Sequence, residues 1–291
     1  RVGVLSSLTT SRGSFEPTLV PYTAGLDVEA FPLEDVAATA AVAQRPFRGS
    51  GSRTSEPRVS NPEYDGRFTF ARIRYRPGPN GYYYDNLPAW AHGYVSPRGG
   101  DRAEHTLMQI MDEVSYLGGR TDGSVVVALD DPELFRYPVA YMSEPGFWTM
   151  DDAEGAGLRA YLMKGGFLIF DDFRHDGHFN SGGGWYNFED NMRRALPELH
   201  PIALDPEASP FHSFFEVDSF DIVPQAYDED PPEFYGYFEN NDQRKRIMAI
   251  VNYSTDIAQY WEFSATGFRP IDESNEAYKL GVNYIIYGLT H

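Results

Sequence analysis

The chain of 291 residues contains no cysteine. This absence excludes disulfide bonds, thiolate catalysis and cysteine-based zinc sites together. Basic residues are scarce too, because 24 lysines and arginines stand against 43 aspartates and glutamates, which gives a formal net charge of -19. Such a balance repels phosphate groups and argues against nucleic acid and anionic membrane surfaces as partners. Cations, carbohydrates and basic proteins remain compatible with it.

Long apolar runs are also absent. No stretch approaches the length that a helix needs to cross a bilayer, so we expect no transmembrane segment and membrane association only through partners. The composition does suit a packed core, since 42% of the residues are hydrophobic and the chain holds 20 tyrosines and 20 phenylalanines. The length is enough for one large domain or two small ones.

Residues 1–66 differ in composition from the rest. They are rich in serine, threonine, proline, glycine and alanine and show neither a helical nor a strand period, which predicts an extended low-complexity arm. Ordering one backbone residue costs about 1–2 kcal/mol, so an ordered arm needs extensive contacts. We expect aromatic anchors of the arm to pack on other protein subunits or on a second copy of the chain: Phe15, Tyr22, Phe31 and Phe47.

Residues 67–291 show an alternation of strands and helices, which predicts an α/β domain with a parallel sheet and helices on both faces. Short apolar runs typical of buried parallel strands alternate with amphipathic segments typical of helices. Strands are expected at 68–75, 124–129, 138–142, 166–170 and 247–251, and helices after Asp101, after a cap at Thr149, around 187–195 and over 275–287. Between the first strand and the first helix, Tyr82, Tyr83 and Trp90 form an aromatic group, read either as an interaction surface or as a local packed cluster.

Several separate motifs in this region carry a resemblance. The strings FTFARIRY (68–75), DPELFRYPVAYM (131–142), GLRAYLMKGGFLIFDD (157–172), PFHSFF (210–215) and AYKLGVNYIIYGLT (277–290) occur in order. Over about residues 67–291 the chain resembles the domain-of-unknown-function 4159 family. The resemblance implies a flavodoxin-like fold of the class I glutamine amidotransferase kind. Since members of the family often look secreted or membrane-attached, it also implies an extracytoplasmic location, periplasmic or secreted.

By comparison with amidotransferases, the position of their cysteine nucleophile falls on Asp171 or Asp172, after the strand at 166–170. A carboxylate cannot replace a thiolate that attacks an amide. The loop that donates an oxyanion-hole amide in those enzymes corresponds to 143–146, where family members tend to have a Gly-His-Gly-like loop. Here Pro145 has no N–H to donate, and Glu144 brings a negative charge.

The densest polar group of the sequence, Asp171, Asp172, His175 and His178, follows this strand. Carboxyl ends of strands in open α/β sheets are where ligands bind. Two carboxylates and two imidazoles can hold a divalent metal or perform acid–base chemistry, but they can also cap a turn and be solvated. His212 can complete a dyad with Asp171 or Asp172, or be a packed residue between aromatics.

Three functions follow as hypotheses. The first is a non-catalytic interaction subunit of an extracytoplasmic assembly, suggested by the missing nucleophile, the altered loop and the arm. The second is a metal-assisted hydrolase that uses Asp171, Asp172, His175 and His178. We predict no cofactor apart from the divalent metal that this second hypothesis allows. The third is a small-ligand or glycan-binding module at the same strand ends.

Overall fold

The computed structural model describes residues 57, 59–82, 87–96, 99–100, 102–173, 184–221, 223–224 and 230–291. Its main element is a seven-stranded sheet in the order β5-β1-β6-β8-β11-β10-β9. The first five of these strands are parallel, whereas β10 and β9 run antiparallel at one edge. The bounds are β1 (Ala71–Arg74), β5 (Val125–Ala128), β6 (Val139–Ser143), β8 (Phe167–Asp171), β9 (Ile202–Ala203), β10 (Glu233–Phe238) and β11 (Ile247–Tyr253).

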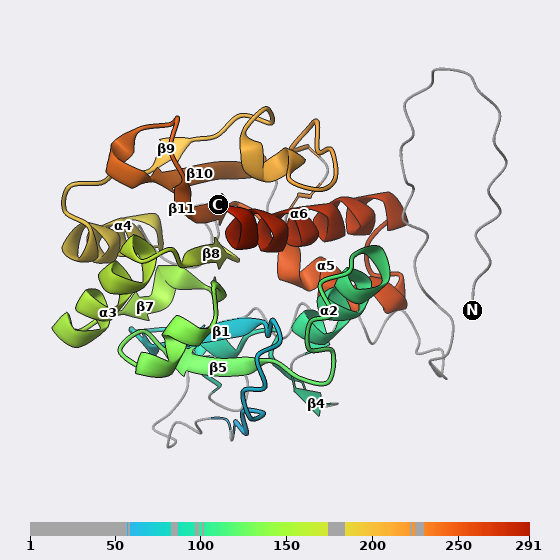
Figure 1. Cartoon of the computed structure of the whole chain (residues 1–291), viewed down its shortest axis with the longest axis horizontal. Coiled ribbons are helices and arrows are strands. Elements are labelled where there is room, and N and C mark those ends of the chain that lie inside the picture. The colour runs from blue at the N-terminus through green and yellow to red at the C-terminus, as the bar shows by residue number, and fades with distance from the viewer. Residues whose placement is uncertain are drawn as a thin grey trace, which may run out of the picture.

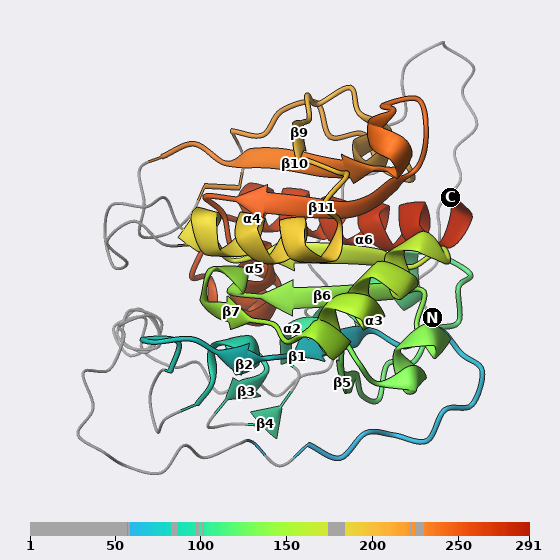
Figure 2. The same cartoon turned by 90° about the vertical axis from the view of Figure 1, so that its left-hand side faces the viewer.

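Helices cover both faces of the sheet (Figure 1). One face carries α3 (Asp152–Met163) and α4 (Gly184–Ala195), which lie in front of the strands in Figure 2. The other face carries α2 (Arg102–Val114), α5 (Ile257–Phe263) and α6 (Ile271–Thr290). The apolar core accordingly forms two clusters, one under each helical layer.

Two small antiparallel sheets and several 3-10 turns complete the described fold. One sheet pairs β2 (Arg76–Pro77) with β7 (Trp148–Thr149), and the other pairs β3 (Val95–Ser96) with β4 (Gly99–Gly100). The 3-10 turns are η2 (Ala89–Ala91), η3 (Pro132–Arg136), η4 (Pro145–Phe147), η5 (Ser209–His212), η6 (Glu239–Asn241) and η7 (Ser264–Thr266). Within the described residues, no helix combines the length and the apolar character that crossing a membrane requires.

The predicted α/β sheet is confirmed as a mixed, mostly parallel one. Every residue of β6, β8 and β11 is buried, as the continuous apolar runs predict for strands covered on both faces. One predicted detail is wrong: α3 is capped by Asp151, not by Thr149. Asp151 accepts from the backbone N–H groups of Ala153 and Glu154, and the Glu154 carboxylate accepts from the N–H of Asp151 in return. This reciprocal capping box outcompetes a threonine placed two residues earlier.

The end of the predicted arm packs on its own domain. Asn61 pairs its side-chain amide with edge strand β5, accepting from Val126 N at 2.9 Å and donating to Val126 O at 2.8 Å. Arg120 donates to Glu63 O and to the Asp65 carboxylate, 2.9 and 2.7 Å away. The anchors Phe15, Tyr22, Phe31 and Phe47 lie outside the described residues, so packing on another subunit stays a prediction.

The fit of α3 on the sheet gives a stability prediction. A Cβ at Gly157 would meet the backbone O of Leu129 at 2.0 Å, whereas a Cβ at Gly155 would meet only the flexible end of Met150, at 3.2 Å. Gly157→Ala should therefore destabilise the fold by about 2 kcal/mol or more, because the helix has to move off the strand end. Gly155→Ala should be neutral or stabilise by up to about 1 kcal/mol through helix propensity.

Urea denaturation of both variants beside the wild type measures this difference. The two substitutions are chemically identical and lie on one helix, so helix propensity cancels between them. Equal midpoints for the two variants would contradict the close approach of α3 to the end of β5.

Candidate metal centre

Three neighbouring strands end in residues whose backbone is left-handed although they are not glycine. Glu144 follows β6 with φ 51°, Asp172 follows β8 with φ 65°, and Ser254 follows β11 with φ 53°. Such residues are uncommon and cluster at functional sites, where the surrounding structure holds them in place. Because Ser143 pairs with Asp171 in the parallel register, Glu144 and Asp172 come to lie side by side.

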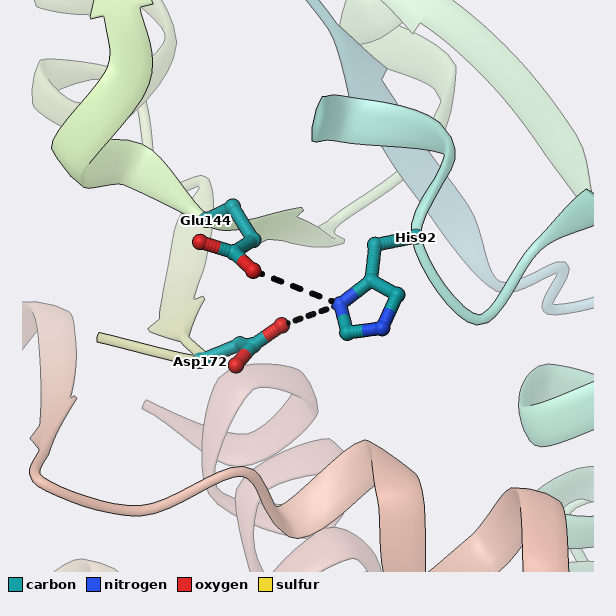
Figure 3. Close-up of side chains that lie close together, drawn as sticks. All are labelled: His92, Glu144 and Asp172. Atoms are coloured by element: carbon teal, nitrogen blue, oxygen red, sulfur yellow. Dashed lines mark hydrogen bonds and ion pairs between the residues drawn. The ribbon is translucent and has the colours of Figure 1, made fainter. Parts of the chain in front are cut away.

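His92 joins these two carboxylates from a distant part of the chain. It lies in the turn after η2, and its Nδ1 faces both carboxylates while the other ring nitrogen points away (Figure 3). Nδ1 is 2.5 Å from Oδ2 of Asp172 and 3.4 Å from Oε1 of Glu144. The strand order reverses between β1, which precedes His92, and β6, which precedes Glu144. The group therefore lies at the point of an open α/β sheet where ligands bind.

The three side chains are almost withdrawn from solvent, with 12% of His92, 6% of Glu144 and 1% of Asp172 exposed. Burial alone would lower the pKa of His92, but the charges and hydrogen bonds of Asp172 and Glu144 raise it well above its ordinary value. The imidazole is consequently cationic at neutral pH when no other cation is bound. One oxygen or nitrogen of each residue lies within 4.8 Å of the others, a spacing that can hold a metal ion.

More carboxylates surround this group. Burial raises the pKa of Asp256, the cap of α5, well above its ordinary value, and the negative charges of Asp172 and Asp171 act in the same direction. Burial also raises the pKa of Glu262 to about 7, against the opposing charges of His92, Arg102 and Arg72. Glu262 adjoins the His92 turn, since a Cβ at Gly93 would lie 3.5 Å from its Oε2. The two carboxylates that contact His92 thus carry more negative charge than the single imidazole balances.

Asp171 has a different role from its neighbour Asp172. Its carboxylate accepts from Tyr141 OH at 2.9 Å, from Asn252 Nδ2 at 3.1 Å, and from backbone N–H groups at the start of α5. Burial and the charge of Asp172 raise the pKa of Asp171 to about 7, although these hydrogen bonds oppose the shift. Asp171 therefore joins β6, β8, β11 and α5, while Asp172 turns toward His92.

The family resemblance expected from the sequence motifs is confirmed by a family model. The model of the family described as Domain of unknown function (DUF4159) matches residues 70–289. The chain belongs to this family. No curated protein is similar enough to the chain to match it.

Two of the four polar residues expected from sequence lie in the part of the DUF4159 domain that the structure describes. Asp171 and Asp172 lie at the carboxyl end of β8 as expected, but His175 and His178 lie outside the described residues. His212 has other partners: its Nδ1 contacts the Glu216 carboxylate, and its Nε2 lies 2.7 Å from Pro206 O. These contacts favour the alternative of a structural histidine.

Sequence reasoning missed His92, and it noticed Glu144 only as a charge in a loop. A usable signal for Glu144 was its place directly after a buried strand, the same place that Asp172 occupies. For His92 the only signal was its position between the first strand and the first helix, a connection that starts at the same edge of the sheet.

Tyr82 and Trp90, the described residues of the aromatic group expected from sequence, are half-buried and buried rather than exposed on the surface. Trp90 is completely buried in the core, which favours the alternative of a local packed cluster over an interaction surface. Tyr82 is half-buried and forms an isolated bridge with Pro88, and Tyr83 lies outside the described residues. Trp90 instead helps to position the turn that carries His92.

The raised pKa values predict how stability depends on pH. With a chelator present, the free energy of unfolding should fall between about pH 5 and about pH 8. His92, Asp171, Asp256 and Glu262 have raised pKa values, so the folded chain holds more protons than the unfolded chain in this range. Their stabilisation is complete below the unfolded-state values and is lost as the pH rises through the folded-state values.

Urea denaturation at constant ionic strength measures this slope. Glu262→Gln should make it shallower, whereas Asp65→Asn should not, because Arg67 lowers the pKa of Asp65 to about 2, outside the range. Stability that rises from pH 5 to pH 8 would show that the buried groups are not protonated as described.

Proposed function

We propose that the DUF4159 domain is a metal-assisted hydrolase whose divalent cation is held by His92, Glu144 and Asp172. One observation carries the proposal: an imidazole nitrogen and two carboxylates converge at buried strand ends, within 4.8 Å of one another. The proposal changes the ligand set expected from sequence. Of Asp171, Asp172, His175 and His178 it keeps only Asp172, and it adds Glu144 from the end of β6 and His92 from the turn after η2.

Charge balance supports a cation at this place. The carboxylates of Glu144 and Asp172 contact one imidazole, and those of Asp256 and Glu262 lie near enough for His92 to act on them electrostatically. Buried carboxylates without compensation are costly, so they either take up protons or bind a cation. A divalent ion in place of the His92 proton neutralises two of them directly.

The distances are compatible with this exchange. Donors about 2.1 Å from a tetrahedral ion are about 3.4 Å apart, which matches the separation of His92 Nδ1 and Glu144 Oε1, 3.4 Å. The distance between His92 Nδ1 and Asp172 Oδ2, 2.5 Å, is instead that of a hydrogen bond in which a proton lies between the two atoms. The Asp172 carboxylate has to withdraw by no more than about 1 Å to admit the ion.

The donor set favours Zn²⁺ or a similar transition ion over Mg²⁺ and Ca²⁺, since one of the three ligands is an imidazole. Such an ion, held by His92, Glu144 and Asp172, would supply an activated water and polarise a carbonyl group. The negative surroundings disfavour phosphate esters, so we infer a neutral ester, amide or glycoside as substrate.

The strand order also supports the finer fold assignment as a proposal. When the five parallel strands are numbered in chain order, they lie across the sheet in the order 2-1-3-4-5. This is the strand order of flavodoxin-like folds. The likeness to class I amidotransferases remains part of this proposal. The interaction-subunit hypothesis, the extracytoplasmic location and the glycan-binding alternative stay predictions, because no contact of the described residues bears on them.

Titration with Zn²⁺ tests the proposal. The wild type should bind one ion and gain about 2.7 kcal/mol of stability at an ion concentration one hundred times the dissociation constant. At a fixed ion concentration the gain should be larger at high pH, because protons compete with the ion for His92 and so raise the apparent dissociation constant at low pH. His92→Gln, Glu144→Gln and Asp172→Asn should each weaken binding at least about tenfold in calorimetry.

His212→Gln is the matched control, because His212 also contacts a carboxylate but lies on η5, away from the strand ends. Absence of ion binding, or equal weakening by His92→Gln and His212→Gln, would refute the metal centre. Hydrolysis of nitrophenyl esters and glycosides should require the ion and be lost in Asp172→Asn. Failure to hydrolyse any neutral substrate while the ion is bound would refute the hydrolase.

A further inference from the structure

Arg72 is a charged residue in a place where the sheet otherwise holds apolar ones. It lies on β1, between β5 and β6, and none of its surface is exposed. Its Nε contacts the Glu104 carboxylate, which comes from α2 and is also buried. A buried ion pair of this kind is often no more stabilising than two apolar residues of similar size. The presence of the pair therefore needs an explanation other than stability.

The guanidinium group of Arg72 is bound to the backbone of the turn that carries His92. Its Nη1 donates to Trp90 O at 3.1 Å and to His92 O at 2.7 Å. The same group lies over the ring of Tyr141, with 4.9 Å between the guanidinium carbon and the ring centroid. Tyr141 in turn donates to Asp171, the residue before Asp172. The guanidinium group of Arg72 thus contacts the turn that carries His92 and also strand β6, which Glu144 follows.

Glu104 fixes the orientation of this group. One of its oxygens contacts Arg72 Nε, while its Oε2 is buried and has no hydrogen-bond partner among the described residues. Leaving an acceptor unsatisfied costs about 1–3 kcal/mol, so the pair is not arranged for maximal stability. It does leave Nη1 directed at the two carbonyl groups of the turn.

We propose that Arg72 is the positioning residue of His92. By holding the carbonyl groups of Trp90 and His92, it fixes the turn so that Nδ1 of His92 faces Glu144 and Asp172. Lysine cannot replace it, because a single ammonium group lacks the planar fork that reaches Glu104 and both carbonyl groups together. The link to metal affinity rests on the proposed function, whereas the orientation of His92 does not.

Two variants separate positioning from a merely structural role. Arg72→Lys keeps the charge but loses the fork, and Arg72→Met with Glu104→Met replaces the buried pair by apolar side chains. Both should stay folded in circular dichroism, and both should raise the Zn²⁺ dissociation constant about 10–100-fold, as is usual when the support of a metal ligand is removed. Arg246→Lys is the matched control, since Arg246 also donates to two backbone carbonyl groups, Gly166 O and Leu162 O, and Gly166 directly precedes β8 whereas Asp172 follows its end.

A second readout does not involve a metal. In the chelator-treated wild type, the His92 Nδ1 proton bonded to Asp172 should give a strongly downfield proton resonance, and His92→Gln identifies it. This resonance should be lost or shifted upfield in both Arg72 variants and retained in Arg246→Lys. If the wild type binds no Zn²⁺ but the resonance behaves in this way, the metal centre fails and the positioning role stands. Folded Arg72 variants that keep the resonance, or that bind Zn²⁺ as tightly as the wild type, would overturn the proposal.

Discussion

The arrangement of the strand ends depends on one buried carboxylate, that of Asp171. It accepts hydrogen bonds from β6 through Tyr141, from β11 through Asn252, and from the first backbone N–H groups of α5. Tyr284 on α6 extends this network by donating to Asn252 at 3.0 Å. Every group that these hydrogen bonds join to Asp171 is a donor, so the carboxylate form accepts from all of them. The carboxyl ends of β6, β8 and β11 are thereby held next to one another where the site forms.

This constraint explains why two adjacent aspartates have different roles. Asp171 is the last residue of β8, and its side chain points into the layer that α5 and α6 cover. The backbone then turns into the left-handed region at Asp172, which directs the next carboxylate toward His92 instead. A residue with a side chain in that conformation is strained, and aspartate tolerates it better than most. The strain is the cost of bringing two acidic side chains from one strand end to two different places.

The sequence supported the prediction of the parallel strands and of the long helices, because their hydrophobic periods are strong and local. It did not reveal β9, β10 or α5, which are short or depend on tertiary contacts. The cap of α3 has a local signal in the sequence, because Asp151, unlike Thr149, has the reciprocal partner Glu154 three residues later. The site was half predicted: Asp172 stood out in a polar run, whereas His92 is 80 residues from Asp172 in the chain and meets it only through folding.

The pairing of Asn61 with β5 bears on how such a domain avoids association with other chains. β5 is an edge strand, and an edge with free N–H and C=O groups is a template for strand addition. The Asn61 amide occupies both backbone groups of Val126 and so imitates one residue of a further strand. At the opposite edge, β9 is only two residues long. A partner that pairs with β5 at Val126 has to displace the Asn61 side chain first.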